Sequence, residues 1–532
     1  MKKYWRLIRK DLILFGFLTF LSYVFYALIP YFTKILFEGH YVTAIIGYTI
    51  SLLLFVFFAY LSNITQTRYK QHFDMSLKKD YFKAVISLDY EEFKKKKVGE
   101  YISFQANDIT EISNDYLSPL VAIITQSIRV VTYFVIIGIT LNVTVSLILL
   151  AVSFLGVLLP KSLGKETAKR RNNYLKQQKT YYSRIEEIFN GFRTVNRRTR
   201  GNITSEHNNS LEKISKERYR YGRANGLMWA LNGLGSESIN YVIFLYLGYL
   251  TFLGNITAGF AIATFQYAQG LMEPVHEILY YRSLVNSSKD LVDKYLHFVS
   301  NDSIVLEEKE IVKDFKQIDF EGVTKILGDF NIENISTSIQ KNQKVAIIGL
   351  NGSGKSTLLN LLGSYYNPTT GKIIVDGKKL TELDSSHLIG ILDQKEYIYS
   401  DSFEDNVSMF GSYDLIPDNP FLKNAENIIG MNDCSKLSGG EKQILGLVRL
   451  LNKNTPIIVL DEPLAAVDIS KRDDLFKKIL GLKKTIIIIT HKIDSSLKGF
   501  DKIIFMHNGK IICEGVYNDI MRNEKFAKYF LN

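Results

Sequence analysis

Two short stretches of the sequence contain the residue types that bind phosphate groups. Residues 349–357 (GLNGSGKST) place glycines, a lysine and hydroxyl groups between a β-rich run and a helical one. Glycines let backbone N–H groups turn toward a phosphate, and the start of the helix adds its dipole. Residues 436–443 (KLSGGEKQ) place a hydroxyl and two glycines before a second helical run. The chain therefore contains one phosphate-binding loop and a second candidate anion site.

The first stretch has the G-x-x-x-x-G-K-S spacing of a nucleotide-binding P-loop. Lys355 is expected to reach the β- and γ-phosphates, and Ser356 is expected to ligate Mg²⁺. The alternative, a glycine-rich turn without a ligand, is disfavoured because the motif and its flanking elements agree. The candidate ATP-binding residues are Gly349, Asn351, Gly352, Ser353, Gly354, Lys355, Ser356 and Thr357.

Two acidic residues and a histidine follow two later β-rich runs. Asp461 and Glu462 end the run 457–460, where Asp461 can hold Mg²⁺ through water and Glu462 can polarise a water for attack on the γ-phosphate. Acidic residues often end strands, so this pattern gains its meaning from the P-loop. His491 follows the run 485–490. Taken alone, a histidine in such a place is more often a surface or capping residue than a catalytic one.

The segments that must position these residues are short β-rich runs that alternate with helical patterns from about residue 320. This alternation is typical of an α/β domain with a mostly parallel sheet. A charged stretch at 301–319 precedes it and is interpreted as a linker. The sequence therefore predicts an α/β P-loop NTPase domain over residues 320–532.

Residues 1–300 have a different character, because six apolar segments there are each close to the roughly 20 residues that cross a bilayer. The connections are alternately very short and long, polar and basic, and the apolar spacing in the long ones is helical. The sequence predicts an all-α transmembrane domain with long cytoplasmic helical extensions and both termini cytoplasmic. A buried, soluble helical domain is the disfavoured alternative. The spans are expected at about 12–37, 41–63, 117–141, 143–163, 228–253 and 256–285.

The net charge of +11 at pH 7 indicates a membrane rather than nucleic acid. Lysine and arginine gather beside the apolar segments, as the positive-inside rule predicts. Two cysteines give neither a disulfide framework nor metal-ligand spacing. The lysine- and isoleucine-rich, proline-poor composition favours a bacterial source, so the expected location is a bacterial cell membrane with the NTPase domain in the cytoplasm.

The order of motifs in the second domain resembles the nucleotide-binding domain of ATP-binding cassette (ABC) transporters, over about 320–530. The residues that carry the resemblance are the P-loop, Gln394, the LSGGE run at 437–441, the run 457–462, the turn 465–468 and His491. The N-terminal part is similar to the six-span domain of exporter-type (type IV) members, with weaker marks at 93–109, 189–196 and 270–279.

The resemblance implies that two cassettes face each other head to tail and bury ATP and Mg²⁺ between them. The candidate anion site would then serve the nucleotide of the opposite subunit, through Ser438, Gly439 and Gly440. The resemblance also assigns Glu462 as general base, His491 to the γ-phosphate, and Asp468 to a turn at the subunit interface. Mg²⁺ would be held by Ser356, Gln394 and Asp461, and Gln394 would also contact the attacking water.

One position departs from the family pattern. Members usually stack the adenine on an aromatic residue before the P-loop, but Leu327 stands at that position here. The departure predicts weaker adenine discrimination, with Phe330 as a nearby substitute.

One cassette and six spans make half a transporter, so a second half-transporter is required as partner. A homodimer and a heterodimer both remain open. The turns near 89–97 and 198–207 are expected to form short coupling helices that dock beside Gln394.

Ionisable residues within spans usually face a cavity or a partner. Arg129, Glu237 and Glu273 are the candidates, and they either line a substrate cavity or pair with each other. The favoured function is ATP-driven export of an amphipathic, peptide, lipid or drug-like molecule by alternating access. The alternatives are an exporter-shaped importer of a metal-chelate or siderophore-like solute and an ATP-gated channel.

Overall fold

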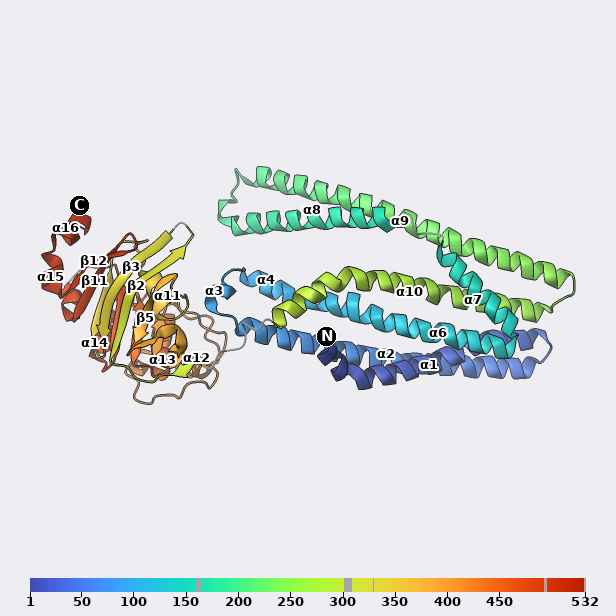
Figure 1. Ribbon diagram of the computed structural model, residues 1–532, viewed down its shortest axis with the longest axis horizontal. Coiled ribbons are helices and arrows are strands. Elements are labelled where there is room, and N and C mark those ends of the chain that lie inside the picture. Colours follow the sequence, from blue (N-terminus) through green and yellow to red (C-terminus); the bar gives the residue numbers. More distant parts are fainter. Residues whose placement is uncertain (159–163, 301–308, 329, 492–494, 531–532) are drawn as a thin grey trace. The chain divides into compact units, whose positions relative to one another are not determined.

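The apolar segments and the β-rich runs form separate parts of the structure (Figure 1). The computed structural model describes residues 1–532 except 159–163, 301–308, 329, 492–494 and 531–532. The chain divides into one compact unit of Met1–Ile86 with Val98–Asn301 and another of Ser87–Lys97 with Asp302–Asn532. The segment Ser87–Lys97 lies inside the predicted transmembrane domain in sequence, but its contacts group it with the unit that contains the P-loop.

The first unit is helical. The helix α1 begins next to the N-terminus, and α9 is the longest described helix, so the predicted extensions beyond the apolar segments are continuous helix. Two π-helical stretches, Phe104–Asp108 and Ile112–Leu117, join α4, α5 and α6 into one helical segment. The helices are α1 (Lys2–Phe37), α2 (Tyr41–Ile86), α4 (Val98–Ser103), α5 (Ile109–Glu111), α6 (Ser118–Thr140), α7 (Val143–Leu158), α8 (Gly164–Asn190), α9 (Arg200–Phe252) and α10 (Ala258–Val299).

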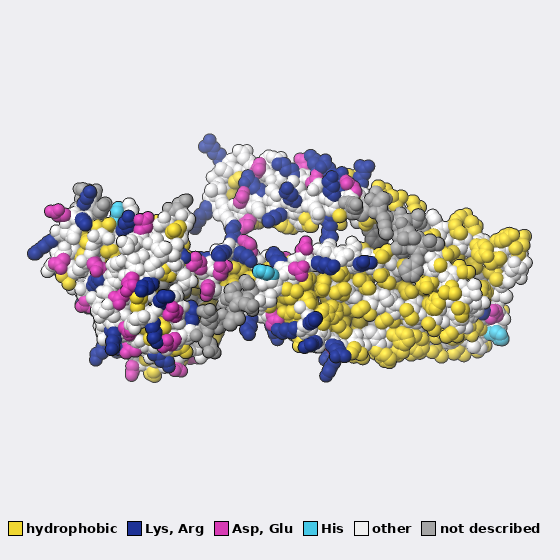
Figure 2. All heavy atoms as spheres, viewed as in Figure 1, with side chains coloured by type: hydrophobic (Ala, Val, Ile, Leu, Met, Phe, Trp, Pro, Cys, Tyr) yellow, Lys and Arg dark blue, Asp and Glu magenta, His cyan; other side chains and the backbone are white. Residues whose placement is uncertain are grey.

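Within this unit α1 packs along α2, and α10 packs against α6. A buried cluster between them includes Tyr133 and Ile137 of α6 with Tyr267 and Leu271 of α10. Many large apolar side chains of α1 and α2 nevertheless face outward, and Phe57 is 54% exposed. Figure 2 shows hydrophobic side chains gathered over α1, α2 and α6, whereas charged side chains gather over α8 and the part of α9 beside it. An outward apolar surface of this kind suits lipid as the surrounding solvent.

Among the residues that the structure describes, three helical segments are long and apolar enough to cross a membrane: Lys2–Phe37, Tyr41–Ile86 and Val98–Thr140. They contain the first three predicted spans. The fourth predicted span lies in α7 up to Leu158, and its last residues, 159–163, fall outside the described residues. The fifth lies in α9, and α10 contains most of the sixth. All six spans remain predictions.

The second unit contains the β-strands. Its main sheet has the order β12-β11-β4-β10-β9-β8, in which β12 alone is antiparallel to its neighbour. A second, antiparallel sheet has the order β3-β2-β5-β6, and the short strands β1 and β7 pair with each other. The strands are β1 (Glu310–Ile311), β2 (Gln317–Leu327), β3 (Phe330–Gln340), β4 (Lys344–Ile348), β5 (Thr370–Val375), β6 (Lys378–Lys379), β7 (Leu383–Asp384), β8 (Ile389–Leu392), β9 (Ile457–Asp461), β10 (Thr485–Thr490), β11 (Lys502–His507) and β12 (Lys510–Gly515).

The helices of this unit are α3 (Tyr90–Phe93), α11 (Lys355–Leu362), α12 (Phe403–Ser408), α13 (Gly439–Asn452), α14 (Ile469–Gly481), α15 (Tyr517–Met521) and α16 (Glu524–Phe530). Of these, α11, α13 and α14 contribute buried apolar side chains to the clusters that cover the main sheet. The expected α/β domain with a mostly parallel sheet is therefore confirmed.

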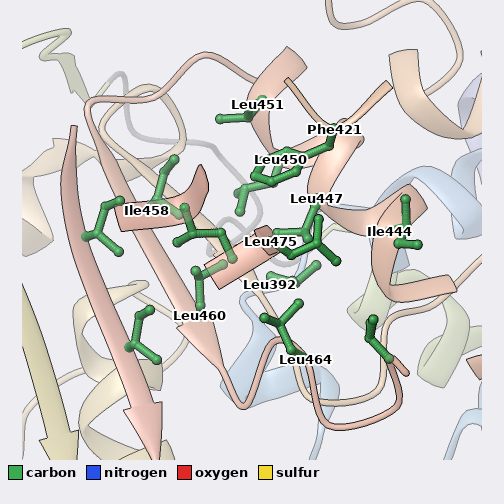
Figure 3. Packing of buried hydrophobic residues seen from close by; sticks show 14 of the residues in the cluster. Leu392, Phe421, Ile444, Leu447, Leu450, Leu451, Ile458, Leu460, Leu464 and Leu475 are labelled. Atoms are coloured by element: carbon green, nitrogen blue, oxygen red, sulfur yellow. The ribbon is translucent and has the colours of Figure 1, made fainter. Parts of the chain in front are cut away.

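The main sheet is buried on both faces, because successive side chains of a strand point to opposite sides. In β10, Ile486 and Ile488 join the cluster that contains α13, whereas Ile487 and Ile489 join the cluster that contains α11. Figure 3 shows part of the first cluster, where apolar side chains of α13 lie near Ile458 and Leu460 of β9. This two-sided burial fixes the ends of β4 and β9, from which the P-loop and the acidic pair emerge.

Candidate functional site

The P-loop connects the end of β4 to the start of α11, as the sequence predicts. Gly354 caps α11 with φ of +101°, and a Cβ there would lie 2.5 Å from Ile332 Cγ2 of β3. Only glycine combines that backbone conformation with that close approach. The loop is thus held against β3 while its backbone N–H groups stay free of side-chain bulk.

Lys355 is buried at the first turn of α11, with 7% of the residue exposed. Its ammonium donates to the carbonyl oxygens of Gly349 and Leu350, each at 2.9 Å. Burial lowers the pKa of Lys355, and the nearby carboxylates of Glu462 and Asp461 oppose that shift. The Lys355 ammonium therefore lies inside the P-loop, where it is expected to bind phosphate.

The acidic pair at the end of β9 lies beside the P-loop. Ser356 Oγ donates to Asp461 Oδ2 at 3.2 Å, which joins the two residues predicted to hold Mg²⁺. Burial raises the pKa of Asp461. A buried carboxylate next to a hydroxyl is a donor set that suits a hard divalent cation.

Glu462 is held by two other predicted residues. Gln394 Nε2 donates to Glu462 Oε2 at 2.8 Å, and His491 Nδ1 lies 2.6 Å from Glu462 Oε1. Glu462 has φ of +48°, an uncommon backbone conformation for a non-glycine residue. Strain of this kind is frequent at functional sites. The structure thus brings together the three residues predicted to be catalytic.

A cavity of about 480 Å³ lies at these residues. Ser353, which is 3% exposed, contributes a buried hydroxyl that has no hydrogen-bond partner among the described residues. That hydroxyl and the predicted cation fit a phosphate group. The lining residues are Phe330, Asn351, Gly352, Ser353, Gly354, Lys355, Ser356, Thr357, Gln394, Asp461 and Glu462.

The cavity lining differs from one expectation. Leu327, at the position where the family pattern has an aromatic residue, is not among the described lining residues, whereas Phe330 is. β2 ends at Leu327 and β3 begins at Phe330, whose ring lies close to the P-loop, because a Cβ on Gly354 would be 3.4 Å from Phe330 Cζ. The substitute that the sequence offers is thus the residue at the cavity.

Ser438, Gly439 and Gly440 begin α13 and do not line this cavity in the described part of the same chain. Ser438 is an exposed N-cap whose hydroxyl accepts from Glu441 N, while Glu441 Oε2 accepts from Ser438 N at 2.8 Å. A Cβ on Gly440 would lie 3.0 Å from Ala466 O, so glycine lets the turn before Asp468 pack closely. Asp468 is exposed at the start of α14.

One buried ion pair near the site was not predicted. Arg449 of α13 pairs with Glu396 at 2.8 Å, and both side chains are nearly buried. Arg449 also donates to Asn406 O at 2.7 Å and to Tyr397 O at 2.9 Å. This network ties the segment after Gln394 to the helix that begins at Ser438. An acidic residue two positions after Gln394 was the available signal, but its partner is 53 residues away.

The two expected coupling helices differ in outcome. Residues 89–97 contain the short helix α3. Residues 200–207 instead form the first turns of the long helix α9, and the reversal occurs just before it. Asn196 Oδ1 accepts from the backbone N–H groups of Arg198 and Thr199, which closes a tight turn there. The expectation of a short separate helix at 198–207 is therefore wrong.

Among the candidate substrate residues, Arg129 and Glu273 pair with each other. Arg129 Nη2 lies 2.9 Å from Glu273 Oε2, and the guanidinium lies about 6 Å from the ring centres of Tyr23, Tyr26 and Tyr133. Glu237, on α9, is exposed and forms no ion pair with a described residue. Gln126 donates to Glu277, which extends the polar group along α6 and α10.

Comparison with known proteins places this geometry in a family. The family model of the ABC transporter matches residues 332–465, and that of the ABC transporter transmembrane region matches 12–275. The solved structure of a bacterial Atm1-family ABC exporter with ATP bound superposes with a TM-score of 0.82 at 18% identity, covering 99% of this chain and 98% of that one.

Two relatives match over most of this chain. A Bacillus subtilis protein that is provisionally named a multidrug export ATP-binding/permease protein is 22% identical, over 81% of this chain and 79% of the relative. The human ABC-type oligopeptide transporter ABCB9 is 24% identical, over 84% of this chain and 62% of the relative. The chain therefore belongs to the ABC transporters, as a half-transporter of the exporter type that fuses a transmembrane region to an ATP-hydrolysing cassette.

Proposed function

We propose that this chain pairs with a second half-transporter and exports an amphipathic solute across a bacterial cell membrane. Membership of the family establishes an ATPase coupled to transport and a dimeric, membrane-bound assembly. The observation that carries the proposal further is the Gln394–Glu462–His491 cluster beside the P-loop. All its members have the side chains that hydrolysis needs, so this chain is an active half rather than a degenerate one.

Each residue of the cavity has a defined task in this proposal. Lys355 and the backbone N–H groups of the P-loop bind the β- and γ-phosphates. Glu462 accepts a proton from the attacking water as the water oxygen bonds to the γ-phosphorus, and the bond from the γ-phosphorus to the bridging oxygen breaks, so that ADP leaves. Gln394 and His491 hold the Glu462 carboxylate from both of its oxygens and so orient it toward that water.

Mg²⁺ belongs to the same proposal, with Ser356, Asp461 and Gln394 as the residues that hold it. The pair of Ser356 Oγ and Asp461 Oδ2 supplies hydroxyl and carboxylate oxygen, the ligands that this cation prefers. When bound, Mg²⁺ neutralises charge on the phosphate oxygens.

The second anion site completes the partner's cavity. Ser438 and Gly439 are exposed and stand apart from the cavity of their own chain. The N-terminus of α13, with its free N–H groups and helix dipole, favours a phosphate there. ATP bound between two chains would hold the cassettes together, and hydrolysis would release them.

The substrate class follows from the polar group in the membrane-spanning helices. The Arg129 guanidinium pairs with Glu273 and lies over tyrosine rings, which present both apolar faces and hydroxyl groups. Charged groups within spans are costly and are usually retained for function. A solute with a large apolar part and a charged or polar group fits such surroundings.

Transport into inside-out vesicles tests the proposal. Purified chain is reconstituted so that cassettes face the bath, and a fluorescent amphipathic dye is added outside with ATP and Mg²⁺. The proposal predicts dye accumulation that needs ATP and disappears in Glu462→Gln. Dye movement toward the cassette side, or passive ion conductance gated by ATP, would instead indicate an importer or a channel.

A further inference from the structure

The segment Ser87–Lys97 joins the P-loop unit through a buried ion pair. Lys325 Nζ of β2 lies 2.8 Å from Glu91 Oε1 and 3.0 Å from Glu91 Oε2. The Lys325 side chain is 7% exposed and that of Glu91 is 40% exposed. Asn367 N also donates to Glu91 Oε2 at 3.4 Å. A lysine is rarely buried unless it is paired, so Glu91 is the group that makes this position tolerable.

Aromatic contacts surround the ion pair. The ring of Tyr90 lies 5.0 Å from that of Tyr365, and Lys325 lies over the ring of Tyr366 at 5.4 Å. Lys94 Nζ lies 4.8 Å from the centre of the Tyr90 ring. The hydrogen bond from Lys325 holds the pKa of Glu91 below its ordinary value. The segment is thus held by one ion pair, whose hydrogen bonds require a defined geometry, and by aromatic contacts, which tolerate a wider range of geometries.

The pair connects the segment to the nucleotide cavity by two routes. Lys325 is the cross-strand neighbour of Ile332, whose side chain lies against Gly354 of the P-loop. Burial raises the pKa of Asp393, and the charge of Lys94 lowers it, which places Lys94 near the residue before Gln394. At its two ends the segment continues into α2, which ends at Ile86, and α4, which begins at Val98.

We propose that Lys325 is a positioning residue that clamps Glu91, so that movement of the nucleotide cavity is passed to α2 and α4. Lys325 touches no residue assigned to phosphate or Mg²⁺, and its task is to fix the register of the segment on β2. Without the pair, the ring contacts hold the segment loosely, and the cavity turns over ATP without moving the helices.

Limited proteolysis measures docking directly. Lys94, Lys95, Lys96 and Lys97 are exposed and follow the pair, so trypsin cleaves there faster when the segment leaves the cassette. In the full chain in lipid nanodiscs, Glu91→Gln and Lys325→Met are each expected to raise that cleavage rate by about tenfold or more, since a buried charge pair loses one partner. The double reversal Glu91→Lys with Lys325→Glu is expected to restore slow cleavage after Lys94–Lys97, measured by mass spectrometry separately from cleavage at the introduced lysine.

A matched control lies on the same sheet. Glu321 of β2 and Lys372 of β5 form an ion pair at 3.1 Å, but both side chains are about half exposed. Exposed pairs contribute little, so Glu321→Gln and Lys372→Met are expected to leave cleavage at 94–97 unchanged. An equal rise in these controls would mean general loosening of the cassette and would overturn the clamp.

A second readout separates positioning from mere stability. The two native cysteines are removed by Cys434→Ala and Cys513→Ala, and a spin label is attached through Asn255→Cys in the turn between α9 and α10. The label reports movement of the helical unit when ATP and vanadate are added. In Glu91→Gln, ATPase kcat is expected to stay within about threefold of the parent while the label response is lost. A label response equal to that of the parent, despite faster cleavage, would overturn the proposal. Neither readout uses a transported solute, so failure here is distinct from failure of the proposed export.

Discussion

His491 Nδ1 lies 2.6 Å from Glu462 Oε1, while the other oxygen of the same carboxylate is held by an amide. Both oxygens of Glu462 are therefore occupied by side chains from different loops. This arrangement fixes the plane of the carboxylate before any water arrives. It also gives His491, a histidine that follows a strand and would otherwise be read as a surface residue, a specific contact with the proposed general base.

Replacing the Glu462 carboxylate by an amide removes the proton acceptor and keeps the shape. Glu462→Gln is expected to lower ATPase kcat by about 10²- to 10⁴-fold, the usual contribution of a general base. ATP binding should remain, so radiolabelled ATP should stay with the purified dimer. Asp473→Asn, at an exposed position of α14, is the control and should hydrolyse ATP normally. Sustained turnover in Glu462→Gln would contradict the assignment of the base.

Phe330 is expected to carry the adenine contact. Phe330→Ala should raise the KM for ATP by about three- to tenfold, the loss of one aromatic stacking contact of roughly 0.5–1.5 kcal/mol. The same change should reduce the difference between the KM for ATP and the KM for GTP. Leu327→Ala is the matched control and should leave both quantities near those of the parent. A larger rise in the KM for ATP in Leu327→Ala than in Phe330→Ala would instead assign the adenine contact to Leu327, the position given by the family pattern.

The lowered pKa of Lys355 predicts proton uptake on ATP binding. Burial favours the neutral amine in the free cavity, so part of the lysine loses its proton at a pH below the ordinary pKa of 10.5. The phosphates of bound ATP favour the charged form and raise that pKa again. Binding therefore takes up protons in the alkaline range, and the affinity falls as pH rises. Calorimetry in buffers of different ionisation heat should show greater uptake at about pH 9 than at neutral pH. Lys372→Met should behave like the parent, and equal uptake at both pH values would refute the shift.

The Arg129–Glu273 pair is expected to stabilise the helical unit unequally from its two sides. The Arg129 side chain is 12% exposed and that of Glu273 is 63% exposed. Glu273→Gln leaves a buried cation and is expected to cost about 1–3 kcal/mol of unfolding free energy, whereas Arg129→Met leaves an exposed carboxylate and should cost less. Thermal unfolding in nanodiscs compares the stability of the two single variants with that of the double variant Arg129→Met with Glu273→Gln. A larger loss for Arg129→Met would contradict the role of burial.

Sequence alone could predict the cassette residues because the motifs that mark them are local. The P-loop, Asp461 and Glu462 each follow a strand at a fixed spacing, and a strand that is buried on both faces delivers them to one edge of the sheet. The same reasoning placed long helices beyond the apolar segments, but it misplaced the short helix expected at 198–207. There, Asn196 closes a tight turn immediately before Arg200, from which the chain continues as the long helix α9.

Contacts between distant segments could not be predicted in the same way. Glu91 and Lys325 are separated by 234 positions, and Arg449 and Glu396 by 53. A charged residue within such a segment has many possible partners, and only the packed structure chooses among them. Likewise, the sequence offered both Leu327 and Phe330 near the adenine position, and only the packed structure shows that Phe330 lines the cavity.

The central claim is that Ser438 of one chain serves the nucleotide bound to Lys355 of the other. Two inactive variants, Ser438→Arg and Lys355→Ala, are given different tags and co-expressed, and mixed dimers are isolated through both tags. If the sites are shared, each mixed dimer has one complete site, from the intact P-loop of one chain and the intact Ser438 of the other.

The matched control combines the parent chain with a chain that carries both changes. Under shared sites that dimer has no complete site, whereas under sites built from one chain it has one. The measurement is ATPase activity of the two purified mixed dimers. For the first mixed dimer the account predicts about half the parental ATPase activity, because one of two independent sites is complete. For the second mixed dimer it predicts nearly no ATPase activity. Activity in the second mixture with none in the first would contradict it.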